Sequence, residues 1–378
     1  MWKNGVDMKI NLTQENLSRA IGLVSKVVAT RGSLPVLSNI LISTDGKRLK
    51  LAATNLEMGI TYWVGCKVEA EGSVTVPARL FGDFVSSLPS NTTLELTANG
   101  AILGITTEHH KTHINGIEAD EFPPIPGKEG KPTLTIPSSQ LREALSEVIV
   151  ATSVDEARPV LAGVYMYSTS ENQVVVVATD SYRLAERKIT VADGSLDGEL
   201  AIIVPTKTIQ ELVRILGDTE SDVSIYASEN QVVFEADGAE ITSRLVDGQF
   251  PNYQQIIPAE SDTVVEIGTK ELARVTKVAS LFARQNAGGI KIDINRGGHL
   301  EIRSTSSEVG DNESSADCKV MGEDAEVSLN ARYLTEALSI IKTPKVSFGV
   351  SGKVSPCVVR PLGKDADEYT YIIMPLRS

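Results

Sequence analysis

Apolar residues recur along this chain with two periods, one typical of helices and one typical of strands. Within residues 12–28, Leu17, Ile21, Val24 and Val28 follow one another at helical spacing, so one face of that segment is suited to burial. Between such segments, apolar and polar residues alternate with the two-residue period of half-buried strands. The alternation is clearest at 94–97, 174–178, 223–226 and 290–294. The chain is therefore expected to combine helices with sheet.

The helix-like segments occur in two sets of three. One set is found at 76–89, 204–217 and 329–342, with starts 128 and 125 residues apart. The other set is found at 12–28, 136–152 and 267–282, aligned through Leu17, Leu141 and Leu272. Two different segments that recur in the same order at this long period indicate three copies of one domain. The helices themselves are predicted at 12–28, 77–88, 138–152, 206–216, 269–282 and 330–342.

Turn signals separate the expected strands at close spacing. The strongest are Asp45-Gly46, Asn99-Gly100, Asp237-Gly238 and Gly297-Gly298. Strand hairpins with two helices per repeat predict an α+β fold, with antiparallel sheet and the helices on one side of it. We place the domains at 8–128, 134–258 and 262–378, preceded by a short extension at 1–7.

Composition excludes several classes of protein. The chain has 378 residues and 42% apolar residues, but no run of eighteen apolar residues and no secretory pattern, so a cytoplasmic location is expected. Cys66, Cys318 and Cys357 are scattered and never in a CxxC spacing, which argues against a disulfide framework or a zinc site. Phosphate-loop, dinucleotide and HExxH motifs are absent, so neither a cofactor nor catalysis is expected.

The distribution of charge matters more than its sum. The chain carries a net charge of −13, yet its six helical windows hold eleven Lys or Arg against seven Asp or Glu, a net of +4. Arg19 and Lys26 lie seven residues apart and opposite the apolar stripe of their helix, and Lys207 and Arg214 repeat that geometry. A mildly basic helical layer favours weak, sequence-independent phosphate contacts, which allow sliding on DNA.

Two other interpretations remain open. His109 and His113 would share one face of a strand, so a metal-dependent hydrolase is one alternative, although no acidic or thiol partner follows at ligand spacing. An interaction scaffold that binds peptides without encircling DNA is the other.

Four segments carry a resemblance to a known family. They are LPVLSNILI at 34–42, ATDSYRLA at 178–185, LVDGQFPNY at 245–253 and YIIMPLR at 371–377. Over residues 8–377 the chain resembles the bacterial DNA polymerase III β subunits, the sliding clamps. The resemblance implies a non-catalytic, head-to-tail homodimer: a six-domain ring lined by twelve helices, with the sheets outside. Such a ring encircles double-stranded DNA and gives the replicative polymerase processivity. Its implied protein partners are that polymerase, a clamp loader and other proteins with clamp-binding peptides, with no membrane involved.

The same resemblance assigns three groups of residues. A peptide-binding pocket between the second and third domains would use Leu161, Thr179, Ser181, Tyr182, Arg183, Leu184, Pro251, Ile256, Val354, Ile372, Met374, Pro375, Leu376 and Arg377. The dimer interface would use Thr112 and Ile114 on one side and Leu281 and Phe282 on the other. DNA contacts map to Arg31, Arg158 and Lys207, to which helix geometry adds Arg19, Lys26 and Arg214.

The sequence departs from the family pattern in a few places. Ser181 and Tyr182 stand where many relatives have Gly and His, which affects the expected depth of the pocket. Gln255 stands where some relatives carry Arg, and Asp155 and Pro159 replace residues implicated in DNA contact.

Overall fold

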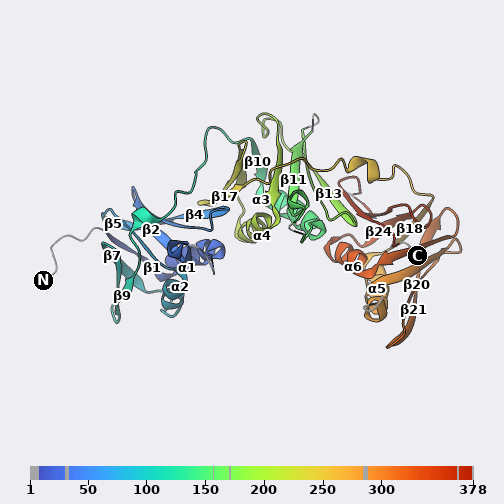
Figure 1. Cartoon of the computed structure of the whole chain (residues 1–378), viewed down its shortest axis with the longest axis horizontal. Coiled ribbons are helices and arrows are strands. Elements are labelled where there is room, and N and C mark those ends of the chain that lie inside the picture. Colours follow the sequence, from blue (N-terminus) through green and yellow to red (C-terminus); the bar gives the residue numbers. More distant parts are fainter. Residues whose placement is uncertain are drawn as a thin grey trace. The chain divides into compact units, whose positions relative to one another are not determined.

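A computed structural model (Figure 1) describes residues 8–29, 34–155, 157–169, 172–283, 288–363 and 366–376. Within them the six predicted helices are present as α1 Gln14–Val24, α2 Ala78–Ser86, α3 Ser138–Val148, α4 Thr206–Ile215, α5 Thr269–Ala283 and α6 Ala331–Ile340. Each lies in its predicted window, except that α5 runs one residue further. Short 3-10 turns continue three of them, as η1 Ser25–Val27, η4 Ile149–Ala151 and η6 Leu216–Asp218. The helix prediction is confirmed.

The strands of the three repeats follow the expected hairpin pattern. The first repeat contains β1 Met8–Thr13, β2 Asn39–Asp45, β3 Arg48–Thr54, β4 Met58–Gly65, β5 Lys67–Ala70, β6 Ser73–Pro77, β7 Thr93–Asn99, β8 Ile102–Thr106 and β9 Lys111–Asn115. The second contains β10 Leu134–Pro137, β11 Gly163–Ser168, β12 Gln173–Thr179, β13 Arg183–Thr190, β14 Ala201–Pro205, β15 Asp222–Ala227, β16 Gln231–Ala236 and β17 Ala239–Arg244. The third contains β18 Thr263–Gly268, β19 Gly289–Asn295, β20 His299–Ser306, β21 Gly310–Asp317, β22 Lys319–Met321, β23 Ala325–Asn330, β24 Lys345–Val350, β25 Cys357–Pro361 and β26 Tyr369–Ile373.

Sheets continue across the repeat boundaries. The eight-stranded sheet has the order β10-β15-β16-β17-β4-β3-β2-β6, and the nine-stranded sheet has the order β14-β11-β12-β13-β26-β25-β24-β18-β22. Strand β17 of the second repeat therefore pairs with β4 of the first, and β26 of the third repeat pairs with β13 of the second. The two remaining sheets, β5-β1-β7-β8-β9 and β21-β20-β19-β23, end in β9 and β21.

This sharing of strands explains how the chain divides into compact units. One unit holds the residues up to Ser139 together with Glu211–Leu245, and the other holds Gln140–Gln210 together with the residues from Val246 onwards. The second repeat is thus divided between the two units, since each of its half-sheets joins a neighbouring repeat. The domain boundaries expected from the sequence period stay a prediction.

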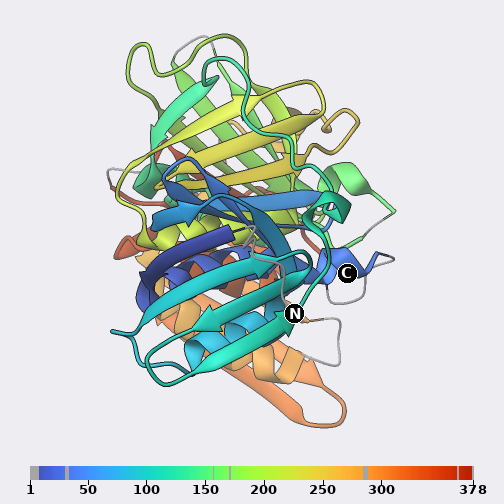
Figure 2. The ribbon, with the colours of Figure 1, turned by 90° about the vertical axis from the view of Figure 1, so that its left-hand side faces the viewer.

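Helices cover one face of each sheet. In β1, Met8, Ile10 and Leu12 are buried, whereas the alternate residues Lys9 and Asn11 are only half-buried. Helices α1 and α2 lie behind the five-stranded sheet in Figure 2. In the third repeat, α5 packs on α6 and on β20 and β21. In the five-stranded sheet, the face away from the helices is accordingly the more polar one.

Candidate peptide pocket and nucleic-acid interface

A polar turn joins β12 to β13 at the ATDSYR segment. The hydroxyl of Thr179 donates to the carbonyl of Arg183 at 2.7 Å and accepts from the amide of Ser181 at 3.1 Å. The Asp180 carboxylate accepts from the amides of Tyr182 and Arg183 at 2.9 and 3.0 Å. Ser181 has a φ of +76°, in the left-handed region that favours glycine.

The first repeat builds the same turn between β3 and β4. Thr54 bonds to the carbonyl of Met58 at 3.0 Å and accepts from the amide of Leu56 at 3.0 Å. Asn55 replaces Asp180 and accepts from the amides of Glu57 and Met58. Leu56 has a φ of +77°, close to the +76° of Ser181. The turn is thus part of the repeated domain, and only its side chains distinguish the second copy.

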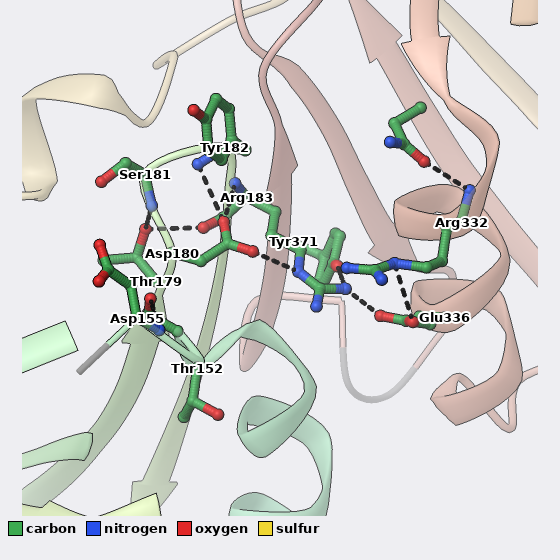
Figure 3. Close-up of polar contacts among 12 residues, drawn as sticks. Thr152, Asp155, Thr179, Asp180, Ser181, Tyr182, Arg183, Arg332, Glu336 and Tyr371 are labelled. Carbon is green, nitrogen blue, oxygen red and sulfur yellow. Dashed lines mark hydrogen bonds and ion pairs between the residues drawn. The ribbon is translucent and has the colours of Figure 1, made fainter. Parts of the chain in front are cut away.

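Arg183 is the residue around which the second and third repeats meet (Figure 3). Its side chain is 6% exposed, and its Nε donates to Asp180 at 3.1 Å. Its Nη1 donates to Glu336 of α6 and, at 3.3 Å, to the hydroxyl of Tyr371 in β26. The guanidinium also lies 4.5 Å from the ring centre of Tyr333. Arg183 therefore connects β13 to α6 and β26.

The electrostatics of this cluster keep Arg183 charged. Burial alone would lower its pKa, but Tyr371 and Glu336 raise the pKa above its ordinary value. Burial also raises the pKa of the Tyr371 hydroxyl, which stays protonated. The described contacts of Arg183 engage its guanidinium within the protein. Its expected role in orienting a peptide stays a prediction.

The predicted pocket residues separate into a buried wall and an exposed rim. Leu161, Leu184 and Ile372 are buried in one apolar cluster with Phe250 and Tyr253. Tyr182, Ile256 and Val354 are exposed by 60%, 38% and 77% of their areas. Pro251 is exposed, Thr179 is buried, and Met374, Pro375 and Leu376 are half-buried. The amide of Met374 donates to the carbonyl of Tyr182 at 2.8 Å, which holds the last strand against the polar turn. Arg377 lies outside the described residues.

An aromatic cleft beside this rim was not predicted. It has a volume of about 540 Å³ and is lined by Tyr165, Tyr167 and residues 249–254, including Pro251. Tyr165 stacks on Tyr167 and on Phe250, with centroid distances of 5.0 and 5.1 Å. The hydroxyl of Tyr253 donates to Glu186 at 2.5 Å and lies 2.8 Å from that of Tyr167. The strand period of the YMY segment placed both tyrosines on one face, and that signal was available in the sequence.

The four predicted dimer residues lie in two different environments. Leu281, near the end of α5, is 48% exposed, and Phe282 is half-buried. Thr112 is half-buried in β9, whereas Ile114 is 2% exposed and belongs to the core of its own sheet. Ile114 thus offers little free surface, and Leu281 offers the most.

The predicted DNA-contact residues are mostly paired with carboxylates. Arg19 lies 3.1 Å from Asp237, and Arg214 donates to both oxygens of Glu211 at 2.8 and 2.7 Å. Arg158 donates to Asp155 at 3.0 Å and to Ser181 at 2.9 Å. Lys26 and Lys207 are exposed. Arg31 lies outside the described residues.

The histidines do not assemble a site. His109 lies in the turn between β8 and β9, so the prediction that it shares a strand face with His113 is wrong; Thr107 holds the turn by accepting from the amide of His110 at 3.0 Å. Among the described residues, no three His, Cys, Asp or Glu side chains gather as metal ligands. No helix in the described part of the chain is long and apolar enough to cross a membrane.

Comparisons with known proteins agree over nearly the whole chain. Family models for the N-terminal, central and C-terminal domains of the DNA polymerase III beta subunit match residues 8–126, 135–252 and 254–377. The beta sliding clamp of Synechococcus elongatus is 32% identical over 375 residues, which cover 98% of this chain and 99% of the relative.

Solved structures give the same result. The DNA polymerase sliding clamp of Bacillus subtilis superposes with a TM-score of 0.93 at 28% identity, covering 98% of this chain and 100% of that one. The DNA polymerase III subunit beta of Pseudomonas aeruginosa superposes with a TM-score of 0.92 at 28% identity and the same coverage.

Proposed function

The chain belongs to the DNA polymerase III β subunit family, the bacterial sliding clamps, and we propose that two copies of it close head-to-tail into the DNA-encircling ring. A sliding clamp gives a polymerase processivity by surrounding duplex DNA, so that retention depends on topology instead of a strong grip. A net charge of −13 is compatible with that mode, because a ring needs only weak phosphate contacts.

The unpaired sheet edges support closure by a second copy. The second repeat joins a neighbour on both sides, because its β17 pairs with β4 of the first repeat and its β13 pairs with β26 of the third. The corresponding strands left over are β9 of the first repeat and β21 of the third, and each is an edge strand among the described residues. An exposed edge is a template for strand pairing, and a head-to-tail contact that closes makes a ring.

The internal junctions also predict the register of that contact. Core-facing residues pair as Ile241 with Ile60 at one junction and as Tyr371 with Ala185 at the other. The same two positions can be found in the free edge strands by following the paired residues across each sheet. They are Thr112 in β9, which pairs with Ile105, and Asn312 in β21, which pairs with Ser304. Antiparallel pairing around them sets Lys111 opposite Glu313 and His113 opposite Asp311. The charges of the two edges are therefore complementary.

Exposed apolar residues support the same contact. At the junction of the second and third repeats, Tyr333 of α6 packs on Arg183 of the polar turn. At the free ends, Leu80 of α2 stands at the position of Tyr333, and Val309, which precedes β21, stands at the position of Tyr182 beside Arg183. Leu80 and Val309 are 56% and 58% exposed, and a copy-to-copy contact would bury both.

We further propose that partner proteins bind at the rim formed by Tyr182, Ile256 and Val354 around Met374. Apolar side chains exposed beside a buried wall offer a surface for the aliphatic and aromatic residues of a short peptide, and Met374 can adapt to different ligands. With Arg183 already engaged, apolar contact and backbone groups would provide most of the recognition. The replicative polymerase and the clamp loader are the expected partners, and the clamp itself is proposed to be non-catalytic.

Retention on DNA tests the ring directly. Purified protein is placed on nicked circular duplex DNA with the clamp loader of its host, and the complex is separated from free protein by gel filtration. We expect co-elution with the circle and loss when one restriction cut makes the DNA linear, because a ring slides off ends. Equal retention on both forms, or on neither, would contradict the proposal. A scaffold that binds peptides but does not encircle DNA would be retained on neither.

A further inference from the structure

The second helix of each repeat carries the same charge pattern in the same place. A basic residue is the second residue of the helix, and an acidic residue follows four positions later, one helical turn along. These pairs are Arg79 with Asp83 in α2, Lys207 with Glu211 in α4, and Arg332 with Glu336 in α6. The spacing between repeats, 128 and then 125 residues, equals that of the helices themselves.

This order of charges works against the helix that contains it. The N-terminal end of a helix favours acidic residues, and an acidic residue placed before a basic one is the stabilising order. All three pairs have the reverse order, and none of the three helices has an acidic residue in its first turn. Helix stability therefore does not account for the pairs in α2 and α6, whereas Glu211 of α4 also stands three residues before Arg214, in the stabilising order.

Each acidic residue neutralises a basic neighbour in the structure. Glu211 holds Arg214 through both carboxylate oxygens, at 2.8 and 2.7 Å. Glu336 lies 3.5 Å from Arg332, and Asp83 lies 3.8 Å from Arg79. The paired arginines remain largely exposed, with Arg214 at 56% and Arg79 at 95% of their side-chain areas. Each arginine thus faces solvent with a counter-charge of the protein's own beside it.

We propose that Asp83 and Glu211 screen the basic residues of α2 and α4 from DNA phosphates, so that the ring slides freely instead of gripping. This inference rests on the proposed function, in which the helices face the duplex. A cation that already has a carboxylate partner releases fewer counterions from DNA when it approaches a phosphate, which weakens binding and flattens its dependence on salt. Removal of the carboxylate charge should create a grip that the native protein lacks.

The test is a salt titration of binding to a fluorescent linear duplex, followed by anisotropy, for Glu211→Gln and Asp83→Asn. Each additional phosphate contact should tighten binding by about five-fold at 0.15 M salt and steepen the slope of log K against log salt by about 0.9. A ring of two copies carries each substitution twice. The effect should be larger for Glu211→Gln, because its bidentate contact is closer than the 3.8 Å pair of Asp83.

Glu69→Gln is the matched control. Glu69 pairs with Lys9 at 3.2 Å and Lys67 at 2.9 Å, on the face of the five-stranded sheet away from the helices. The substitution Glu69→Gln removes the same charge and breaks similar ion pairs, so it reports the effect of net charge alone. Slopes for Glu211→Gln and Asp83→Asn that equal the slope of Glu69→Gln would overturn the inference.

The outcomes for the ring and for the screening are separate. Native protein that fails to stay on circular DNA would contradict the ring. Native protein that stays on the circle, with no steeper slope in either helix variant, would contradict only the screening. Should Glu211→Gln fail to fold, Asp83→Asn alone decides, because both members of its ion pair are exposed.

Discussion

Replacement of Arg183 by methionine should loosen the join between the second and third repeats. Removal of one member of a buried ion pair costs about 3–5 kcal/mol, because a charge is left buried without its partner. Here the carboxylate of Asp180 keeps two backbone donors, and Glu336 is 34% exposed, so both are partly compensated. We therefore expect a loss of about 2–3 kcal/mol for Arg183→Met, slightly below the usual cost for a buried pair.

Hydrogen exchange followed by mass spectrometry measures this loss where it occurs. It reports the opening free energy of individual segments, so the result is not averaged over the three repeats of the chain. Amides of β13 and β26 should exchange roughly 30- to 150-fold faster in Arg183→Met, since each 1.4 kcal/mol is about a factor of ten. Glu336→Gln should change the same amides in the same direction.

Arg303→Met is the matched control. Arg303 also contacts three carboxylates, those of Asp293, Glu301 and Glu313, but its side chain is 47% exposed. Exposed ion pairs contribute about 0–1 kcal/mol, so exchange near Arg303 should change by less than about five-fold. Exchange of β13 and β26 within two-fold of the native rate in Arg183→Met would refute the reasoning, and would leave Arg183 free to act as a peptide contact.

Three further outcomes are expected. Gly116→Ala should destabilise its unit by about 3 kcal/mol in chemical unfolding, because the new Cβ would lie 1.7 Å from the Thr75 carbonyl oxygen. The control Gly22→Ala, on the exposed face of α1, should stabilise slightly, and equal effects of the two substitutions would contradict this reasoning. Burial raises the pKa of the Cys357 thiol to about 12, so at pH 8 iodoacetamide should modify Cys66 and Cys318 first, and Cys357 should react only as the pH approaches 12. Early labelling of Cys357 in mass spectra would be inconsistent with its burial. Truncation after Ile373 should abolish the binding of a polymerase peptide, measured by fluorescence polarisation, because Met374 and the residues after it form part of the rim. Dimers should persist in sedimentation, and retained peptide binding would rule out this pocket.

Local patterns in the sequence predicted the elements well. The helical windows, the DG and NG turns and the alternating strands depend on residues within a few positions of one another, and the helical windows recur three times. The apolar stripe of Leu17, Ile21 and Val24 is buried in α1 as expected. Repetition strengthened each prediction, because three copies of one pattern rarely arise by chance.

Long-range pairing was beyond these patterns. Glu336 lies 153 residues from Arg183, and no local signal connects the two, so the ion pair of Arg183 was not predicted. The peptide contact that the family resemblance implies for Arg183 stays a prediction. The sheets shared between repeats could not be predicted for the same reason, since β17 and β4 pair across more than 170 residues of sequence. His109 was misplaced because Thr107 forms a turn that the strand period does not reveal.

A covalently closed ring on DNA would test the central claim most directly. His113→Cys and Asp311→Cys in one chain place the two thiols opposite each other only if β9 of one copy pairs with β21 of the next, at Cβ distances of about 4.5–5.5 Å. After loading on circular plasmid and treatment with a short bismaleimide, we predict a protein–DNA complex that survives detergent and disappears once the plasmid is cut. Each variant that carries only one of the two substitutions should give no such complex. A double variant that forms covalent dimers in solution but is stripped from circular DNA by detergent would contradict encirclement, and one that forms no covalent dimer would contradict the pairing of these edges.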